Sequence, residues 1–158
     1  MLKGVFSTSV PQHEKALTTP IVAVGGLLVE NRKLLLVRRG NPPSRGLWTL
    51  PGGRVKLGET LHDALVREFE EETGIRVQPV GLADAVDIIE RAADGRIRYH
   101  YVVIDYWVER LTGSAQAASD ALEVGWYPID ALPRHDMPPL SHNAITRMLR
   151  ARGFEEAG

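Results

Sequence analysis

The apolar positions of the chain fall first into two strand-like runs. The run IVAVGGLLVE starts at residue 21, a polar break follows at residues 30–32, and the run KLLLVRR comes next. Two largely apolar runs on either side of a short polar break are typical of a hairpin whose strands are covered on both faces. The pattern therefore predicts a buried hairpin over residues 21–39.

A second hairpin is predicted further along the chain. A strand begins at residue 76 and continues to Ile89, and Asp94-Gly95 is a strong hairpin turn signal. The second arm, residues 97–108 (IRYHYVVIDYWV), is rich in aromatic and β-branched residues, which favour strands. Residues 110–121 (RLTGSAQAASDA) are small and polar, so we expect a mobile loop there, followed by a short strand over residues 122–127.

Two stretches have helical spacing instead. In residues 61–73 apolar residues recur at that spacing, Thr60 stands three residues before Asp63 as a near capping box, and Gly74 supplies the left-handed residue that commonly ends a helix. A second helix, capped by Ser141, should run to about Arg152.

These elements predict one α/β domain. Strands interrupted by two helices indicate a mixed sheet between helical layers. The domain should cover residues 20–153, with an N-terminal tail of residues 1–19 and a C-terminal tail of residues 154–158. The N-terminal segment could alternatively be a strand borrowed by a partner subunit.

Composition narrows the class of protein. The chain has 158 residues, of which 44% are hydrophobic and 25% charged, with a net charge of −1 and no cysteine. Disulfides and thiol catalysis are therefore excluded, and the charge gives no reason to expect nucleic-acid or membrane partners. The first fifteen residues contain no apolar core of a signal peptide, and no apolar run approaches the length of a membrane span. A cytoplasmic protein is the default expectation.

The predicted helix over residues 61–73 carries an unusual stripe of carboxylates. At about 100° per residue, Glu68 and Glu72 continue the stripe of the core-facing leucines, and Glu71 lies beside them. Three like charges near a helix C-terminus repel one another and oppose the helix dipole. A hard divalent cation would neutralise them, because Mg²⁺ and Mn²⁺ prefer carboxylate oxygens. A solvated acidic face is the alternative, and Glu70 on the other side of the helix fits that interpretation.

These residues also carry a family resemblance. The pattern is a glycine, five residues, Glu, seven residues, and then Arg-Glu-apolar-any-Glu-Glu-any-Gly-apolar. It is filled without departure by Gly53, Glu59, Arg67, Glu68, Phe69, Glu71, Glu72, Gly74 and Ile75. A chance match is on the order of one in 10⁹ per window. The stretch resembles the Nudix box, which implies an α/β/α sandwich with a mixed sheet between helices.

The resemblance implies an enzyme that hydrolyses a diphosphate linked to another moiety, with Mg²⁺ as cofactor and Mn²⁺ as a substitute. It identifies Glu68 and Glu72 as metal ligands, and Glu71 as a further ligand or the group that orients water. In this family the first glycine of the box, here Gly53, often supplies a backbone carbonyl to the metal. Related pyrophosphatases are often homodimers.

Two box residues are expected to support the site. Glu59 matches a position that supports the metal ligands from behind, although it could also be a solvent-facing acid at a helix N-terminus. Arg67 stands four residues before Glu71, and an ion pair between them would orient that carboxylate.

Residues outside the box are less sharply identified. Many Nudix enzymes have a general base on a loop after the long hairpin; here Asp120 and Glu123 are available, and Asp120 is the better placed. Arginine makes bidentate contacts to phosphate, and four arginines flank the box. The candidates for phosphate binding are Arg38, Arg39, Arg45 and Arg54. Trp48 and Tyr101 could stack on a nucleobase, but core packing is the more ordinary role.

The sequence leaves more than one substrate class open. The run from Val22 to Thr60 looks closest to the ADP-ribose pyrophosphatase-like group, which implies hydrolysis of ADP-ribose to AMP and ribose 5-phosphate. A proline present beyond the box in many ADP-ribose hydrolases is absent, however, and Arg91 stands in its place. A nucleoside triphosphate pyrophosphatase of the MutT type, which removes oxidised nucleotides, is the first alternative. A non-catalytic nucleotide sensor is the second, and the complete glutamate set argues against it.

Overall fold

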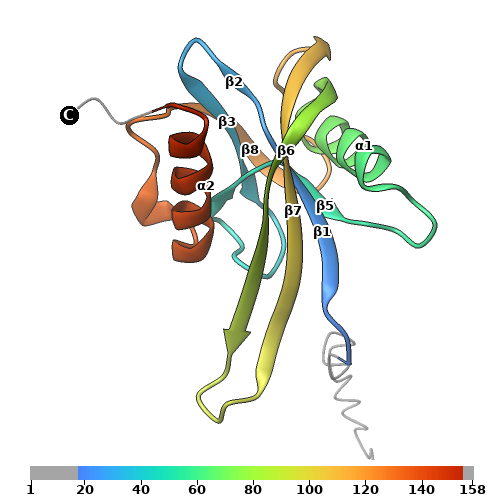
Figure 1. Ribbon diagram of the computed structural model, residues 1–158, viewed down its shortest axis with the longest axis vertical. Coiled ribbons are helices and arrows are strands. Elements are labelled where there is room, and N and C mark those ends of the chain that lie inside the picture. The colour runs from blue at the N-terminus through green and yellow to red at the C-terminus, as the bar shows by residue number, and fades with distance from the viewer. Residues whose placement is uncertain (1–17, 155–158) are drawn as a thin grey trace, which may run out of the picture.

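The computed structural model describes residues 18–154, so most of the two predicted tails, residues 1–17 and 155–158, lies outside the described part. Two α-helices lie on opposite sides of the strands, as Figure 1 shows. The elements in chain order are β1 (Ile21–Leu27), β2 (Val29–Glu30), β3 (Lys33–Arg39), β4 (Trp48–Thr49), β5 (Gly52–Arg54), α1 (Leu61–Thr73), β6 (Arg76–Arg91), β7 (Ile97–Thr112), β8 (Ala121–Pro128), the 3₁₀ turn η1 (Arg134–Asp136) and α2 (Pro139–Ala151).

The strands form two sheets. The first has the order β5-β1-β7-β6, and it is mixed because β1 and β7 run parallel while the other pairs are antiparallel. The second is antiparallel, with the order β2-β3-β4 and with β8 paired to β3. The predicted α/β/α architecture with a mixed sheet is confirmed, with the strands divided between two sheets.

The first predicted hairpin is only partly right. Asn31 and Arg32 have φ of 50° and 58°, so the polar break is the turn, and β2 pairs with β3 across it. The longer strand β1 does not pair with β3, because the chain changes sheets at Leu28 and β1 lies beside β7. That partner is about 80 residues away along the chain, so the local apolar pattern carries no sign of it.

Helix α1 begins and ends where its sequence predicts. The Thr60 hydroxyl accepts a hydrogen bond from the Asp63 N–H at 3.1 Å, and Gly74 has φ of 73° and donates its N–H to the Glu70 carbonyl. Both ends therefore satisfy backbone groups that a helix leaves unpaired. Helix α2 differs, because it begins at Pro139 and Ser141 lies inside it without capping. A proline in the first helical position has no N–H to satisfy and a preset φ, so α2 starts earlier than the Ser141 signal indicates.

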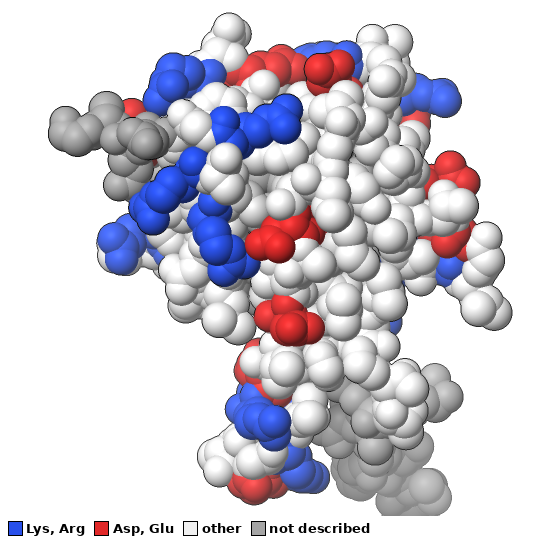
Figure 2. All heavy atoms as spheres, viewed as in Figure 1, with Lys and Arg blue, Asp and Glu red and all other residues white. Residues whose placement is uncertain are grey.

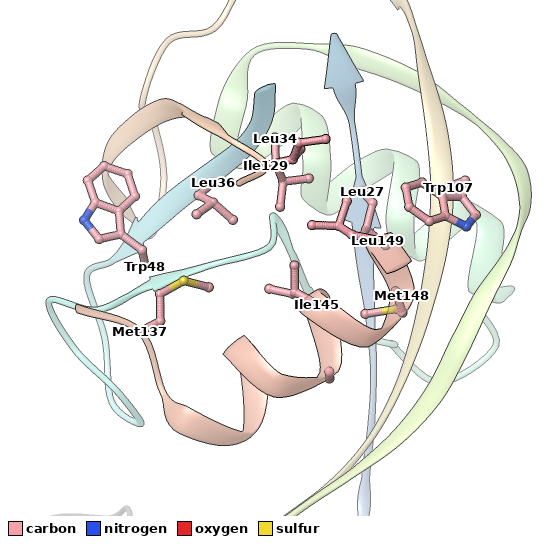
Figure 3. Packing of buried hydrophobic residues seen from close by; sticks show 11 residues of the cluster. Leu27, Leu34, Leu36, Trp48, Trp107, Ile129, Met137, Ile145, Met148 and Leu149 are labelled. Carbon is pink, nitrogen blue, oxygen red and sulfur yellow. The ribbon is translucent and has the colours of Figure 1, made fainter. Parts of the chain in front are cut away.

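Strand periodicity divides the core between the two helices. Leu34 and Leu36 belong to a cluster that packs on α2 through Ile145 and Leu149, whereas Leu35 packs on the opposite side with Phe69 of α1. Successive side chains of a strand point to opposite faces, so one apolar strand supplies both cores. Figure 3 shows the cluster beside α2.

The β6–β7 hairpin is longer than its sequence predicts. Each strand has 16 residues, and Arg76 pairs with Thr112, so residues 110–112 belong to β7 rather than to the predicted loop. The pairing partner continues the strand through residues whose own composition is polar. In Figure 1 the far end of this hairpin projects beyond both helices. Among the described residues, no helix has both the length and the apolar character that a membrane crossing requires.

Candidate active site

A cleft of about 660 Å³ lies on the α2 side of the mixed sheet. Its floor is one face of β1 and β7, and its walls come from the start of α2, from residues 39–50 and from the end of α1. Apolar side chains supply most of the lining, with a small number of charged groups among them, which is typical of a small-molecule site. The charged residues of the lining are Arg39, Arg54, Glu68, Glu72, Glu90, Asp105 and Asp120.

Glu72 is the most buried acid of α1. It is 8% exposed, and its Oε2 accepts a hydrogen bond from the Gly52 N–H at 3.1 Å. Burial raises the pKa of the Glu72 carboxyl to about 8, and the neighbouring Glu68 and Asp120 carboxylates act in the same direction. The Gly52 N–H and the Arg39 guanidinium oppose this rise without cancelling it. A buried carboxylate with one neutral donor is a group that a cation would stabilise.

Glu68 lies one helical turn before Glu72 and against the start of β5. A Cβ added to Gly53 would come within 2.5 Å of the Glu68 Cδ, so only a glycine lets the main chain approach the carboxylate this closely. Burial also raises the pKa of Glu68, although its ion pair with Arg67 acts the other way. Strand β5 therefore brings the Gly53 main chain next to Glu68, and the Gly52 N–H next to Glu72.

Arg67 contacts three carboxylates, those of Glu59, Glu68 and Glu71. Its guanidinium donates to both oxygens of Glu59, at 2.7 and 2.8 Å, and to Glu68 Oε1 at 2.8 Å. It also donates to the Arg54 carbonyl at 3.2 Å. The bidentate contact with Arg67 holds the pKa of Glu59 down at about 2. Arg67 thus orients Glu68 and closes the junction between α1 and β5.

Glu71 does not join Glu68 and Glu72 in the cleft. Its side chain is 45% exposed and lies 3.4 Å from Arg67, which is the predicted ion pair but the longest of the Arg67 contacts with a carboxylate. Among residues 18–154 no three histidine, aspartate or glutamate side chains converge as a ready metal site. The three glutamates predicted to form the metal site are therefore divided into a cleft pair, Glu68 and Glu72, and an outer member, Glu71.

Asp120 lies at the margin of the cleft on the loop over residues 113–120. The loop is held by backbone hydrogen bonds, from Gln116 to the Thr73 carbonyl at 2.8 Å and from Ala118 to the Glu72 carbonyl at 3.2 Å. The Asp120 carbonyl in turn accepts from the Gly40 N–H at 2.8 Å. A loop whose composition predicts mobility is thus tied to α1 and to the chain after β3. The alternative base, Glu123, pairs with Arg38 at 2.7 Å and does not line the cleft.

The four candidate arginines separate into two groups. Arg39 and Arg54 line the cleft; Arg39 donates to the Pro43 carbonyl at 2.7 Å, and Arg54 donates to the Tyr101 hydroxyl at 3.2 Å. Arg38 and Arg45 do not line it. Because Arg38 is engaged by Glu123, we expect phosphate contacts from Arg39 and Arg54 only. The aromatic residues separate similarly, since Tyr101 lines the cleft and Trp48 is buried in the core with its ring edge on Tyr127.

The charge of the surface is uneven although the net charge is only −1. Figure 2 shows Lys and Arg gathered over the side of the molecule where Figure 1 has α2. Helix α2 carries Arg147 and Arg150 and also supplies one wall of the cleft. A local excess of cations beside a cleft favours the approach of anionic ligands.

Asp105 is a buried charged residue of the cleft that the sequence analysis did not identify. It lies on β7, is 4% exposed, and its Oδ1 has no hydrogen-bond partner among the described residues. Burial raises the pKa of this carboxyl to about 7, and the Asp84 carboxylate on β6 adds to the rise. An acid inside the apolar run YVVIDYWV is the sequence signal that could have identified it.

Comparison with known proteins identifies the family. The model of the NUDIX domain matches residues 19–148, which is most of the chain, so the chain belongs to the NUDIX family. It is 35% identical over 115 residues to the ADP-ribose pyrophosphatase of Methanocaldococcus jannaschii, covering 73% of this chain and 66% of that protein. It is also 35% identical over 117 residues to an 8-oxo-dGDP phosphatase of Mus musculus, covering 71% of this chain and 33% of that protein.

Solved structures agree with the family. The MutT NUDIX hydrolase of Burkholderia pseudomallei superimposes with a TM-score of 0.71 at 32% identity, covering 81% of this chain and 97% of that one. The chain spans less than two thirds of the length of both curated relatives described above. The relatives are named for different substrates, so family membership alone leaves the substrate open.

Proposed function

We propose that this protein hydrolyses a nucleoside diphosphate linked to another moiety, and that ADP-ribose is the substrate it favours, with AMP and ribose 5-phosphate as products. The observation that carries the proposal is the pair formed by the partly buried Glu68 and the buried Glu72, which lie beside the Gly52-Gly53 main chain at one end of a cleft of about 660 Å³. Arg39 and Arg54 line the same cleft and suit the phosphates of a diphosphate.

The carboxylate pair fits a divalent metal. Two partly or wholly buried acids with raised pKa values lie on one face of α1, and within residues 18–154 the only direct hydrogen-bond donors to them are the Gly52 N–H for Glu72 and Arg67 for Glu68. Mg²⁺ is commonly held by one or two carboxylates together with substrate phosphates, so a set of three protein acids is not required. Glu68, Glu72 and the Gly53 main chain would hold it, and Mn²⁺ would substitute. When bound, such an ion neutralises phosphoryl charge and lowers the pKa of water.

The remaining residues have distinct tasks in this proposal. Arg67, held by Glu59, keeps the Glu68 carboxylate oriented. Glu71 pairs with Arg67 from outside the cleft. Water attacks one phosphorus and the phosphoanhydride P–O bond breaks, so that the bridging oxygen leaves with its electron pair on the second phosphate product, while the proton released by the water passes to the Asp120 carboxylate. Such transfers need positioning and charge neutralisation more than covalent help.

A second candidate is hydrolysis of an oxidised nucleoside di- or triphosphate. It is favoured by relatives named 8-oxo-dGDP phosphatase and 8-oxo-dGTP diphosphatase, and by the absence of the expected proline, where Arg91 stands near the end of β6. Homodimer formation and a cytoplasmic location also remain proposals.

Product analysis of the purified protein with Mg²⁺ distinguishes these candidates. ADP-ribose, nucleoside triphosphates and their 8-oxo forms are offered in parallel. AMP plus ribose 5-phosphate supports the first proposal, whereas a monophosphate plus pyrophosphate or phosphate supports the second. No product from any of them, with Mn²⁺ also tried, would overturn both.

A further inference from the structure

Asp105 lies in line with the carboxylate end of the cleft. Across the mixed sheet Gly52 is opposite Gly25, and Gly25 is opposite Asp105. Since neighbouring strands are about 4.8 Å apart, the Asp105 main chain lies about 10 Å from Gly52, whose N–H binds Glu72. One small ligand can cover that span.

The Asp105 carboxyl lies over Gly25. A Cβ added to Gly25 would overlap Asp105 Oδ1 and would come within 3.6 Å of the Leu50 Cβ. The absence of a side chain at Gly25 therefore gives the Asp105 carboxyl the space to reach from β7 over β1. The carboxyl is directed along the floor of the site.

No structural partner explains this buried acid. Its Oδ1 has no hydrogen-bond partner among residues 18–154. The cross-strand neighbour Asp84 is also an acid, and Asp84 Oδ2 already accepts from Arg147 of α2 at 3.0 Å while Oδ1 accepts from the Ala85 N–H at 2.8 Å. Burying a polar group without a partner costs free energy, and native proteins retain few such groups.

The surroundings of Asp105 suit a flat apolar ligand. The next row of the floor contains Val86 and Val103, and the middle of α2 contributes Ala144 and Ile145 to the lining. An ionised carboxylate in such a slot can only accept hydrogen bonds. A nucleobase is the part of a nucleotide that combines apolar faces with N–H donors at its edge.

We propose that Asp105 binds the nucleobase of the substrate through hydrogen bonds from the N–H edge of the base to its carboxyl group. The inference rests on the proposed function, because it assigns the base to one end of a cleft whose other end binds the diphosphate. It makes Asp105 a determinant of base selectivity rather than a catalytic residue.

The test compares binding of AMP, GMP and base-free ribose 5-phosphate by calorimetry, without divalent metal, to the wild type and D105N. The variant should lose about tenfold or more in affinity for at least one nucleotide, as expected for a hydrogen bond to a charged group, and should bind ribose 5-phosphate unchanged. D87N is the matched control, because Asp87 is an exposed acid on β6 outside the cleft lining. It should bind all three ligands as the wild type does.

A stability measurement separates ligand binding from a structural role. In the ligand-free protein at pH 8, D105N and D105V should both raise the melting temperature, because they remove a buried carboxylate without a partner. A lower melting temperature in both variants, or unchanged nucleotide affinity in D105N, would overturn the inference. If the wild type hydrolyses nucleotides while D105N binds them normally, only the Asp105 inference fails. If the wild type neither binds nor hydrolyses any nucleotide, the proposed function fails with it.

Discussion

The acids at the two ends of the cleft differ in their hydrogen-bond partners. At one end Glu68 and Glu72 come from a single helix, and hydrogen bonds from Arg67 and the Gly52 N–H partly satisfy them. At the other end Asp105 comes from the floor of the sheet, and its Oδ1 has no partner in the described chain. We propose that the first arrangement holds a cation, and that the second leaves one acceptor for a ligand. The two proposals together assign diphosphate chemistry to α1 with the turn before it, and base selection to β7.

Replacing Glu72 should have the largest effect on the carboxylate end. Glu72→Gln keeps the volume and the hydrogen bond from Gly52, so the fold should remain, while metal-dependent turnover should fall by at least roughly 100-fold, more than the loss of a supporting residue. Steady-state kinetics across a Mg²⁺ titration check this. A rate near that of the wild type would show that the metal site is wrongly assigned.

The two acids after the long hairpin should differ sharply. Asp120→Asn should lower kcat by roughly 100-fold or more if this acid accepts the proton from water. Glu123→Gln removes only an exposed pair with Arg38 and should change kcat by less than about twofold. Equal effects in the two variants would remove Asp120 from the mechanism, and pH–rate profiles of both variants provide the second readout.

The Arg67 network should be sensitive to geometry rather than to charge alone. Arg67→Lys keeps the charge but cannot contact Glu59 through two donors and also reach Glu68, so turnover should fall by roughly 10- to 100-fold. Arg45→Lys is the control, since Arg45 does not line the cleft. A fully active R67K would mean that Glu68 needs no orientation from this residue.

The stability of the metal-free protein should fall as pH rises, and both ends should contribute. Glu72 has a folded pKa of about 8 against 4.5, and Asp105 about 7 against 3.8, so the folded state holds protons that the unfolded state has released. The stabilisation from each group begins to fall near its unfolded pKa and is fully lost above its folded pKa. The free energy of unfolding, measured by denaturant between pH 4.5 and 8, should therefore fall less with pH in E72Q and in D105N than in the wild type. The difference should be roughly 1–3 kcal/mol for each variant. Profiles parallel to the wild type would contradict the burial of these carboxyls.

Local signals predicted the fold where the determining contacts are local. Thr60, Asp63 and Gly74 define α1 to the residue, because both caps use atoms within a few positions of the helix ends. The sheet change at Leu28 and the extension of β7 to Thr112 depend on partners far along the chain, and no short window contains them. The start predicted from Ser141 was wrong although its determinant is local, because the helix begins earlier, at the preceding Pro139.

The same distinction holds for the site. The box brought Glu59, Arg67, Glu68 and Glu72 together because all four lie in one helix and the turn before it. Which arginines line the cleft depended on pairing: Arg38 points to Glu123 of β8, whereas the neighbouring Arg39 lines the cleft. Asp105 was not identified from the sequence, because its surroundings depend on the strand register that places it opposite Gly25 and Asp84.

The most direct test of the two-ended site is a Mn²⁺ binding isotherm by electron paramagnetic resonance, recorded on the wild type, E72Q and D105N at the same pH. We expect E72Q to lose most of the binding and D105N to match the wild type. Equal loss in both variants would show that Asp105 belongs to the metal site, and binding retained in E72Q would contradict the assignment of the carboxylate end.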